Sequence, residues 1–254
     1  GFDMVNDICG FADPEMPEVC AEYDVAVAKM ASPPDLERPG AVEKPDDIYD
    51  ALFLNGLTDK TIVDPAFGGW SDAKTLEDDR ETLRRLREFR AIGQPMLVSI
   101  NRKNFLRELV DRSTEEALPA SLAATSMAVE RGAHVVRTHD VAETSDAAII
   151  GAEFARDRVR EDIVEELDVT SVREAARHLA DGEGSPDPEA TVGRLFALDL
   201  PEPARESLMT AAADIDAVVA DTGHKVLLGG PVSTLVDLSE QVQDPPALAA
   251  ALAG

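Results

Sequence analysis

An α/β fold with a parallel sheet or barrel is predicted for most of this chain, because short apolar runs alternate with helical patterns over residues 1–150. The runs are rich in Val, Ile, Leu and Met, as expected for strands that are buried on both faces. They occupy residues 3–8, 24–30, 61–63, 95–100 and 133–138. The total length of 254 residues allows one large domain, or a large domain and a small one.

Helices are expected between these strands. Asp13-Pro14 marks one helix start, since aspartate caps helices and proline suits the first helical position. Apolar residues at helical spacing, ended by Gly93, predict a helix at 75–92. The acidic run 77–79 within it is expected to be a solvated helix face. Further helices are expected at 46–57, 115–131 and 143–167, which gives five βα units.

The number of units decides between two architectures. A closed TIM barrel needs eight units, and an open doubly wound sheet is the alternative for five. The most common form of the open sheet is disfavoured, because no GxGxxG follows the first strand. We therefore expect residues 1–168 to form an incomplete barrel, and the apolar start at Gly1 predicts a preceding segment.

A small α/β appendage is expected at residues 169–254. The regular alternation of strands and helices stops here. Helices are expected near 189–198, 202–214 and 233–242. Two apolar runs at 216–221 and 226–229, separated by a turn, predict a β-hairpin. No motif in this part points to a chemical role.

The charge of the chain excludes some partners. Asp and Glu number 50 against 24 Lys and Arg, which gives a net charge of −26. Duplex DNA or an anionic membrane would repel such a surface. Only six of the basic residues are lysines, and a surface rich in carboxylates but poor in lysine suits concentrated salt, where self-repulsion is screened. We therefore predict a halophile, most simply an archaeon, with an ordinary acidic bacterial protein as the alternative.

The compartment is expected to be the cytoplasm. Cys9 and Cys20 are the two cysteines, too few for a disulfide framework. No apolar run is long enough to cross a membrane, and no signal peptide is visible.

Polar residues follow the apolar runs, at the strand ends where a parallel barrel carries its working residues. These strand ends read Asn6-Asp7, Asp64-Pro65, Asn101-Arg102-Lys103 and Arg137-Thr138-His139-Asp140. Residues two apart on a strand share a face, so Arg137 and His139 point the same way, as do Asn101 and Lys103. Positive charge gathered on so acidic a chain predicts an anionic ligand. Asn6 and Asp64 would add hydrogen bonds to a flat heterocycle.

Four segments resemble the strand motifs of dihydropteroate synthases. VNDICG resembles ND[VI]SG, TIVDPAFG resembles DPGFGFGK, PMLVSINRKNF resembles PxLVGxSRKSF, and VVRTHDVAET resembles RVHDVxET. Their order and spacing agree over about residues 1–150, which correspond to βα units four to eight of that family's TIM barrel. The resemblance implies condensation of a 6-hydroxymethyl-dihydropterin diphosphate with p-aminobenzoate, with release of pyrophosphate, in folate biosynthesis.

The resemblance also implies a set of site residues. The pterin would contact Asn6, Asp64, Lys103 and Arg137. The pyrophosphate would contact Arg137 and His139, and the p-aminobenzoate pocket would be bordered by Phe67 and Asn101. Catalytic roles fall on Lys103, Arg137 and His139.

Further expectations concern the whole protein. The family's reaction is assisted by Mg²⁺, whose ligand lies in one of the first three strands. We therefore expect no metal ligand in this chain and no turnover by this chain alone. The family's barrels commonly pair, which predicts a homodimer.

Departures from the family pattern keep other interpretations open. Met30-Ala31 stands where the family has MH, and the longer loop DPAFGGWSDAK moves its lysine to Lys74. For Trp70 in that loop two roles are left open, packing of the loop and a lid over a ligand. For the strand ends the alternatives are turn formation at Asn6 and Asp64, a solvated helix start at Lys103, and an ion pair of Arg137 or His139 with Asp140 or a neighbouring carboxylate.

Two other functions are weighed. A pterin-dependent methyltransferase is disfavoured by the Arg-Lys pair and the Arg-x-His-Asp strand end, because it releases no pyrophosphate. A non-catalytic pterin-binding barrel remnant is the second alternative. The acceptor stays open between p-aminobenzoate and a related arylamine.

Overall fold

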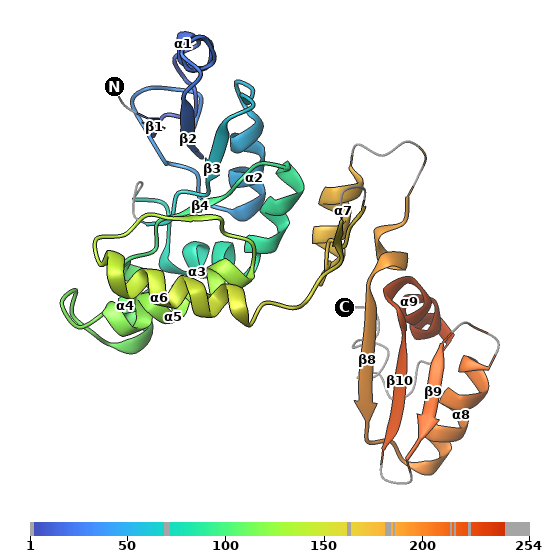
Figure 1. The fold of residues 1–254 in the computed structure, drawn as a ribbon. Coiled ribbons are helices and arrows are strands. Elements are labelled where there is room, and N and C mark those ends of the chain that lie inside the picture. The colour runs from blue at the N-terminus through green and yellow to red at the C-terminus, as the bar shows by residue number, and fades with distance from the viewer. Residues whose placement is uncertain are drawn as a thin grey trace. The chain divides into compact units, whose positions relative to one another are not determined.

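The computed structural model describes residues 3–68, 72–161, 164–180, 184, 186–213, 215, 217–222 and 225–241 (Figure 1). Trp70, for which two roles were left open, lies outside this set. The chain divides into two compact units, residues 1–157 and 158–254. The division falls before the predicted boundary at 168, because the long helix expected at 143–167 ends early.

Five strands follow one another through the first unit, and the pairs that they form are parallel. They are β1 (Met4–Asp7), β2 (Ala26–Met30), β3 (Thr61–Asp64), β4 (Leu97–Val98) and β5 (Val135–Val136). β1, β2 and β3 form one sheet in that order, and β4 pairs with β5. A parallel bridge between Val63 and Met96 joins the two groups. The five predicted strands are confirmed, and their C-terminal ends share one side of the sheet.

Helices separate the strands, as the alternating pattern predicts. They are α1 (Glu15–Glu22), α2 (Pro45–Phe53), α3 (Leu76–Arg84), the 3₁₀ helix η1 (Leu86–Ile92), α4 (Asn104–Val110), α5 (Leu118–Glu130) and α6 (Val141–Glu153). The helix expected at 75–92 is thus two helices that meet at Arg85. Its start is confirmed by a capping box, in which the Thr75 hydroxyl accepts from Asp78 N and the Asp78 carboxylate accepts from Thr75 N. Helix α4 was not predicted.

The prediction of a helix through residue 167 is wrong. Helix α6 ends at Glu153, and the second unit begins with a short antiparallel pair, β6 (Arg160–Glu161) and β7 (Val164–Glu165). Val159 and Val164 lie in this stretch, and their β-branched side chains favour a strand over a helix.

Helices α5 and α6 pack with almost no space between their backbones. A Cβ atom added at Gly151 of α6 would clash with the carbonyl oxygen of Ser126 in α5. The Ser126 hydroxyl donates to the carbonyl of Ala147 at 2.6 Å, which ties the two helices together. Only a residue without a side chain fits at this crossing.

The core of the first unit lies between the strands and these helices. Val63 of β3 and Val98 of β4 are fully buried, and so are Leu52 of α2 and Leu86 of η1. These contacts fix the strands and therefore the polar residues at their ends. Each buried aliphatic side chain contributes about 2 kcal/mol by area.

The second unit is an antiparallel sheet with helices. Its strands run in the order β8 (Gly193–Leu198), β10 (Val226–Pro231) and β9 (Val218–Asp221). The helices are α7 (Val172–Leu179), η2 (Pro188–Thr191), α8 (Glu202–Ala212) and α9 (Val232–Gln241).

The predicted hairpin and the last two helices are confirmed, but the helix expected at 189–198 is wrong. Leu198 of β8 pairs with Val226, so the stretch is held as a strand by β10. No helix in the described part of the chain is long and apolar enough to span a membrane.

Candidate functional site

Arg137 brings three predicted site residues together. It follows β5, and its Nη1 donates to Asn6 Oδ1 at the end of β1 at 2.9 Å. Its Nη2 lies 3.4 Å from Asp64 Oδ2 at the end of β3. Three strand ends far apart in sequence therefore meet through one guanidinium, as parallel strands with their C-terminal ends on one side allow.

Asp64 is buried but keeps one oxygen for a ligand. Its side chain is 1% exposed, and Oδ1 accepts from Ala66 N at 2.8 Å. Oδ2 has no hydrogen-bond partner among the described residues. Burial raises the pKa of Asp64, against the opposing effects of the Ala66 amide and the cations Arg137 and Lys103. A ligand that donates to Oδ2 would satisfy this carboxylate.

Lys103 completes a charged cluster with Asp64 and Arg137. It is half-buried and occupies the residue before α4 in an extended conformation. Burial lowers the pKa of Lys103, while the neighbouring charges of Asp64 and Asp79 oppose this effect and that of Arg137 adds to it. A solvated helix start is therefore the wrong description of Lys103, whose ammonium lies among charged groups of the predicted site.

Asn101 and Asp140 tie the ends of β4 and β5 together. Asn101 Nδ2 donates to Asp140 Oδ2 at 2.9 Å. Arg102 forms two parallel bonds with the same carboxylate, from Nε to Oδ2 at 2.9 Å and from Nη2 to Oδ1 at 3.0 Å. The Arg102 and Asn101 hydrogen bonds hold the pKa of Asp140 down at about 2. Arg102, rather than Arg137 or His139, therefore pairs with Asp140. The alternative of an ion pair with a neighbouring carboxylate is confirmed for Arg137, whose partner is Asp64.

Two predicted residues do not join the cluster. His139 is exposed and makes no hydrogen bond with the described residues, although its charge acts on Asp140. Phe67 is 1% exposed and stacks on Phe105, with ring centroids 5.9 Å apart. Phe67 thus packs in the core, and its contact with an arylamine stays a prediction.

Lys74 and Asp79 are the residues that sequence reasoning missed. Both side chains are buried and form an ion pair of 3.1 Å beside the Asp64 loop. The expectation that run 77–79 is solvated is wrong for Asp79, which faces inward from the first turn of α3. The sequence signal was available, since residues three and four apart on a helix share a face, and Asp79 shares one with buried Leu83.

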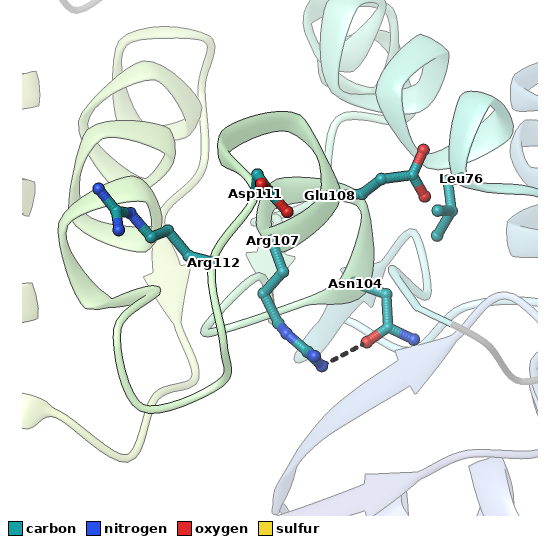
Figure 2. Close-up of a pocket in the computed structure, with 6 residues that line it drawn as sticks. All are labelled: Leu76, Asn104, Arg107, Glu108, Asp111 and Arg112. Carbon is teal, nitrogen blue, oxygen red and sulfur yellow. Dashed lines mark hydrogen bonds between the residues drawn. The ribbon is translucent and has the colours of Figure 1, made fainter.

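A polar hollow of about 450 Å³ lies beside α4 (Figure 2). It is lined by Leu76, Asn104, Arg107, Glu108, Asp111 and Arg112. Arg107 Nη1 donates to Asn104 Oδ1 at 3.0 Å, and Figure 2 shows Arg107 and Glu108 extending in different directions. Asn104 directly follows Lys103 in the sequence, but none of the residues that line the hollow is a predicted site residue. Within the described ranges, no group of three or more His, Cys, Asp and Glu could hold a metal ion.

This geometry agrees with the comparison to known families. A family model described as a pterin binding enzyme matches residues 1–139. The chain belongs to this family. The pterin-binding match covers all five parallel strands and ends at His139.

Known members of the family are similar over about the same region. A dihydropteroate synthase of Escherichia coli K12 is 30% identical over 159 residues, which cover 58% of this chain and 55% of that protein. A probable bifunctional folylpolyglutamate synthase/dihydropteroate synthase of Halobacterium salinarum is 36% identical over 168 residues, or 61% of this chain and 20% of that protein. The chain spans about half the length of the Escherichia coli relative.

Solved structures add the fold. A dihydropteroate synthase of Thermus thermophilus in complex with 4-aminobenzoate aligns with a TM-score of 0.53 and 29% identity, covering 61% of this chain and 63% of that chain. One of Coxiella burnetii in complex with pteroic acid gives 0.52 and 27%, covering 60% and 59%. The first unit therefore has a TIM-barrel-like α/β fold.

Proposed function

We propose that the protein containing this chain is a dihydropteroate synthase, and that its first unit supplies βα units four to eight of the barrel. The reaction joins a 6-hydroxymethyl-dihydropterin diphosphate to p-aminobenzoate and releases pyrophosphate. The observation that carries the proposal is Arg137, which bridges Asn6 and buried Asp64 in a member of the pterin-binding family. Related structures contain pteroic acid, 4-aminobenzoate and 6HMPPP, which supports this substrate class.

The pterin would take the place that Arg137 now fills beside Asp64. Asp64 Oδ2 is an acceptor without a hydrogen bond among the described residues, and a pterin presents adjacent N–H donors. Asn6 is exposed at the neighbouring strand end and offers an amide. Lys103 donates only, so it suits the pterin carbonyl. Together these groups match the donors and acceptors of one flat heterocycle.

The diphosphate requires cations that a ligand can reach. The side chain of Arg137 is 39% exposed, and His139 is exposed. In the reaction, the bond from the pterin methylene carbon to the diphosphate oxygen breaks and the diphosphate leaves with the electron pair. The arylamine nitrogen then bonds to that carbon and loses a proton. Arg137 and His139 would stabilise the negative charge that develops on the leaving oxygen.

Several properties of the whole protein stay proposals. We propose that Mg²⁺ assists the reaction and that a residue of the full-length protein outside this chain holds it. We also propose a cytoplasmic homodimer that works in high salt. The relatives from Halobacterium salinarum and Haloferax volcanii support the salt-adapted interpretation.

The direct test is pyrophosphate release by the full-length protein in concentrated KCl. We expect release that depends on both pterin diphosphate and p-aminobenzoate. Lys103→Ala should abolish it while leaving the fold intact, because it removes the half-buried ammonium of the cluster. Lys225→Ala, which removes an exposed lysine in the second unit, is the matched control.

Other outcomes would identify the alternatives. Methyl transfer without pyrophosphate release would identify the methyltransferase, and pterin binding without turnover would identify the non-catalytic remnant. Full activity of Lys103→Ala would remove the proposed site.

A further inference from the structure

The loop that follows Asp64 is held from two sides. On one side, Asp64 itself accepts a hydrogen bond from Ala66 N at 2.8 Å. On the other side, Lys74 Nζ donates to the carbonyl of Ala66 at 2.7 Å. Gly68 N donates to both oxygens of Asp79 at 3.2 Å. The side chains of Lys74, at the end of the loop, and Asp79, in α3, therefore fix the backbone directly after the proposed pterin-binding carboxylate.

Lys74 and Asp79 are an unusual pair in this chain. Their side chains are 1% and 4% exposed, and their charged atoms lie 3.1 Å apart. Removing two charges from water costs several kcal/mol per ion, so such pairs add little stability over packed apolar residues. The chain has only six lysines and places this one inside the fold. A role in placing the loop explains the pair better than stability does.

The loop in turn supports Lys103. Gly68 has a φ of +111°, and a Cβ added there would lie 2.7 Å from Lys103 Nζ and 3.2 Å from its Cδ. The Lys103 side chain thus lies directly against the Gly68 backbone. Ala66 also has a positive φ, of 60°, which a non-glycine residue adopts only where its surroundings enforce it.

We propose that Lys74 and Asp79 are positioning residues of the site, whose buried ion pair holds Ala66–Gly68 in the conformation that places the Lys103 ammonium beside Asp64. The inference rests on the proposed function, in which the ammonium of Lys103 binds the pterin. The pair acts through the loop and through its charges and does not touch the substrate.

The first measurement is steady-state pyrophosphate release by the full-length protein in high salt. Asp79→Asn and Lys74→Met should each lower kcat by about tenfold or more, with the KM for p-aminobenzoate within about twofold, because misplacing one group by a fraction of an ångström costs rate rather than uniform binding. The matched control is Lys60→Met with Asp24→Asn, an exposed lysine–aspartate pair 2.6 Å apart. This control should leave both constants unchanged.

The second measurement reads Lys103 itself. Trace acetylation from about pH 6 to pH 11, followed by mass spectrometry of the Lys103 peptide, gives its titration midpoint. The charged groups that face Lys103 are Asp64, Asp79, Arg137 and Lys74. Asp79→Asn removes a carboxylate, so the midpoint should fall, whereas Lys74→Met removes a cation, so it should rise.

These outcomes separate positioning from general loosening. A loosened loop would expose Lys103 to water, and the midpoint would rise in both variants. Such a rise, or a kcat within about twofold of wild type in both variants, would overturn the inference. If either variant fails to fold, Gly68→Ala provides a second route, because it leaves the ion pair whole and should still lower kcat by displacing Lys103.

Failure of the proposed function would look different. If the wild-type protein releases no pyrophosphate, the synthase assignment fails. The Lys103 midpoint would still report whether the ion pair acts on the ammonium.

Discussion

Lys29 provides the sharpest test of the energetics of this fold. Its side chain is fully buried in β2. The ammonium donates to the carbonyls of Leu52 and Gly56, each at 2.8 Å, and to that of Leu54. Two of these carbonyls belong to the end of α2 and the residue after it, where the helix dipole favours a cation. The ring of Phe11 lies 4.9 Å from Nζ.

The buried amine predicts a stability that depends on pH. Burial lowers the pKa of Lys29 from 10.5 to about 8, and the charge of Asp7 opposes this effect. Between these two values the unfolded chain binds more protons than the folded chain, so the free energy of unfolding rises with pH. At about 1.4 kcal/mol per tenfold change the difference is about 3 kcal/mol, which residual solvation reduces to about 2 kcal/mol.

The assay is urea unfolding of the wild type and of Lys29→Met at a series of pH values. Methionine keeps an unbranched apolar stem but does not ionise. The free energy of unfolding of the wild type, relative to the variant, should rise by about 2 kcal/mol between about pH 7 and pH 10.5. Other titrating groups cancel in this difference. Lys60→Met at an exposed site should show no such rise, and a flat difference for Lys29→Met would refute the reasoning.

The remaining predictions concern the strand ends and the acidic surface. Asp140 has a pKa of about 2, below its ordinary value of 3.8, so its stabilising contribution is present above about pH 4 and is lost as the pH falls through about 2. Asp140→Asn should therefore lower the urea midpoint at neutral pH, and the two midpoints should converge in acid, whereas a constant gap would contradict the Arg102 pairing. The net charge of −26 predicts that the melting temperature rises with KCl from about 0.1 M to 3 M, because salt screens the repelling carboxylates. Calorimetry checks this, and a melting temperature insensitive to KCl would show that self-repulsion is unimportant.

The parallel strands and their polar ends could be read from the sequence because both follow local rules. Each buried strand is an apolar run, and Asn6, Asp64 and Arg137 are polar residues at the points where such runs stop. Parallel strands bring their C-terminal ends to one side without further information. The sequence could therefore predict that Arg137, Asn6 and Asp64 lie near one another. It could not predict which of them form hydrogen bonds.

The missed features depend on tertiary contacts. Residues 193–198 become a strand because they pair with β10, which follows only after α8 and β9 along the chain, and no local pattern shows that partner. In the sequence Asp79 resembles the two acidic residues before it, which suggests a surface carboxylate. Its burial depends on the ion pair with Lys74, which the loop brings close in space. Arg102 adopts a φ of +52°, which turns its guanidinium toward Asp140 rather than along the strand direction.

The crossing at Gly151 and Ser126 also bears on the far end of α6. Since the two helix backbones touch, α6 has a single rotation and a single height at which it fits. The first residue of α6, Val141, directly follows Asp140. The close helix packing that Gly151 permits therefore helps to set the position of the charged residues after β5. A side chain at that glycine would therefore shift α6 and, with it, the position of Asp140.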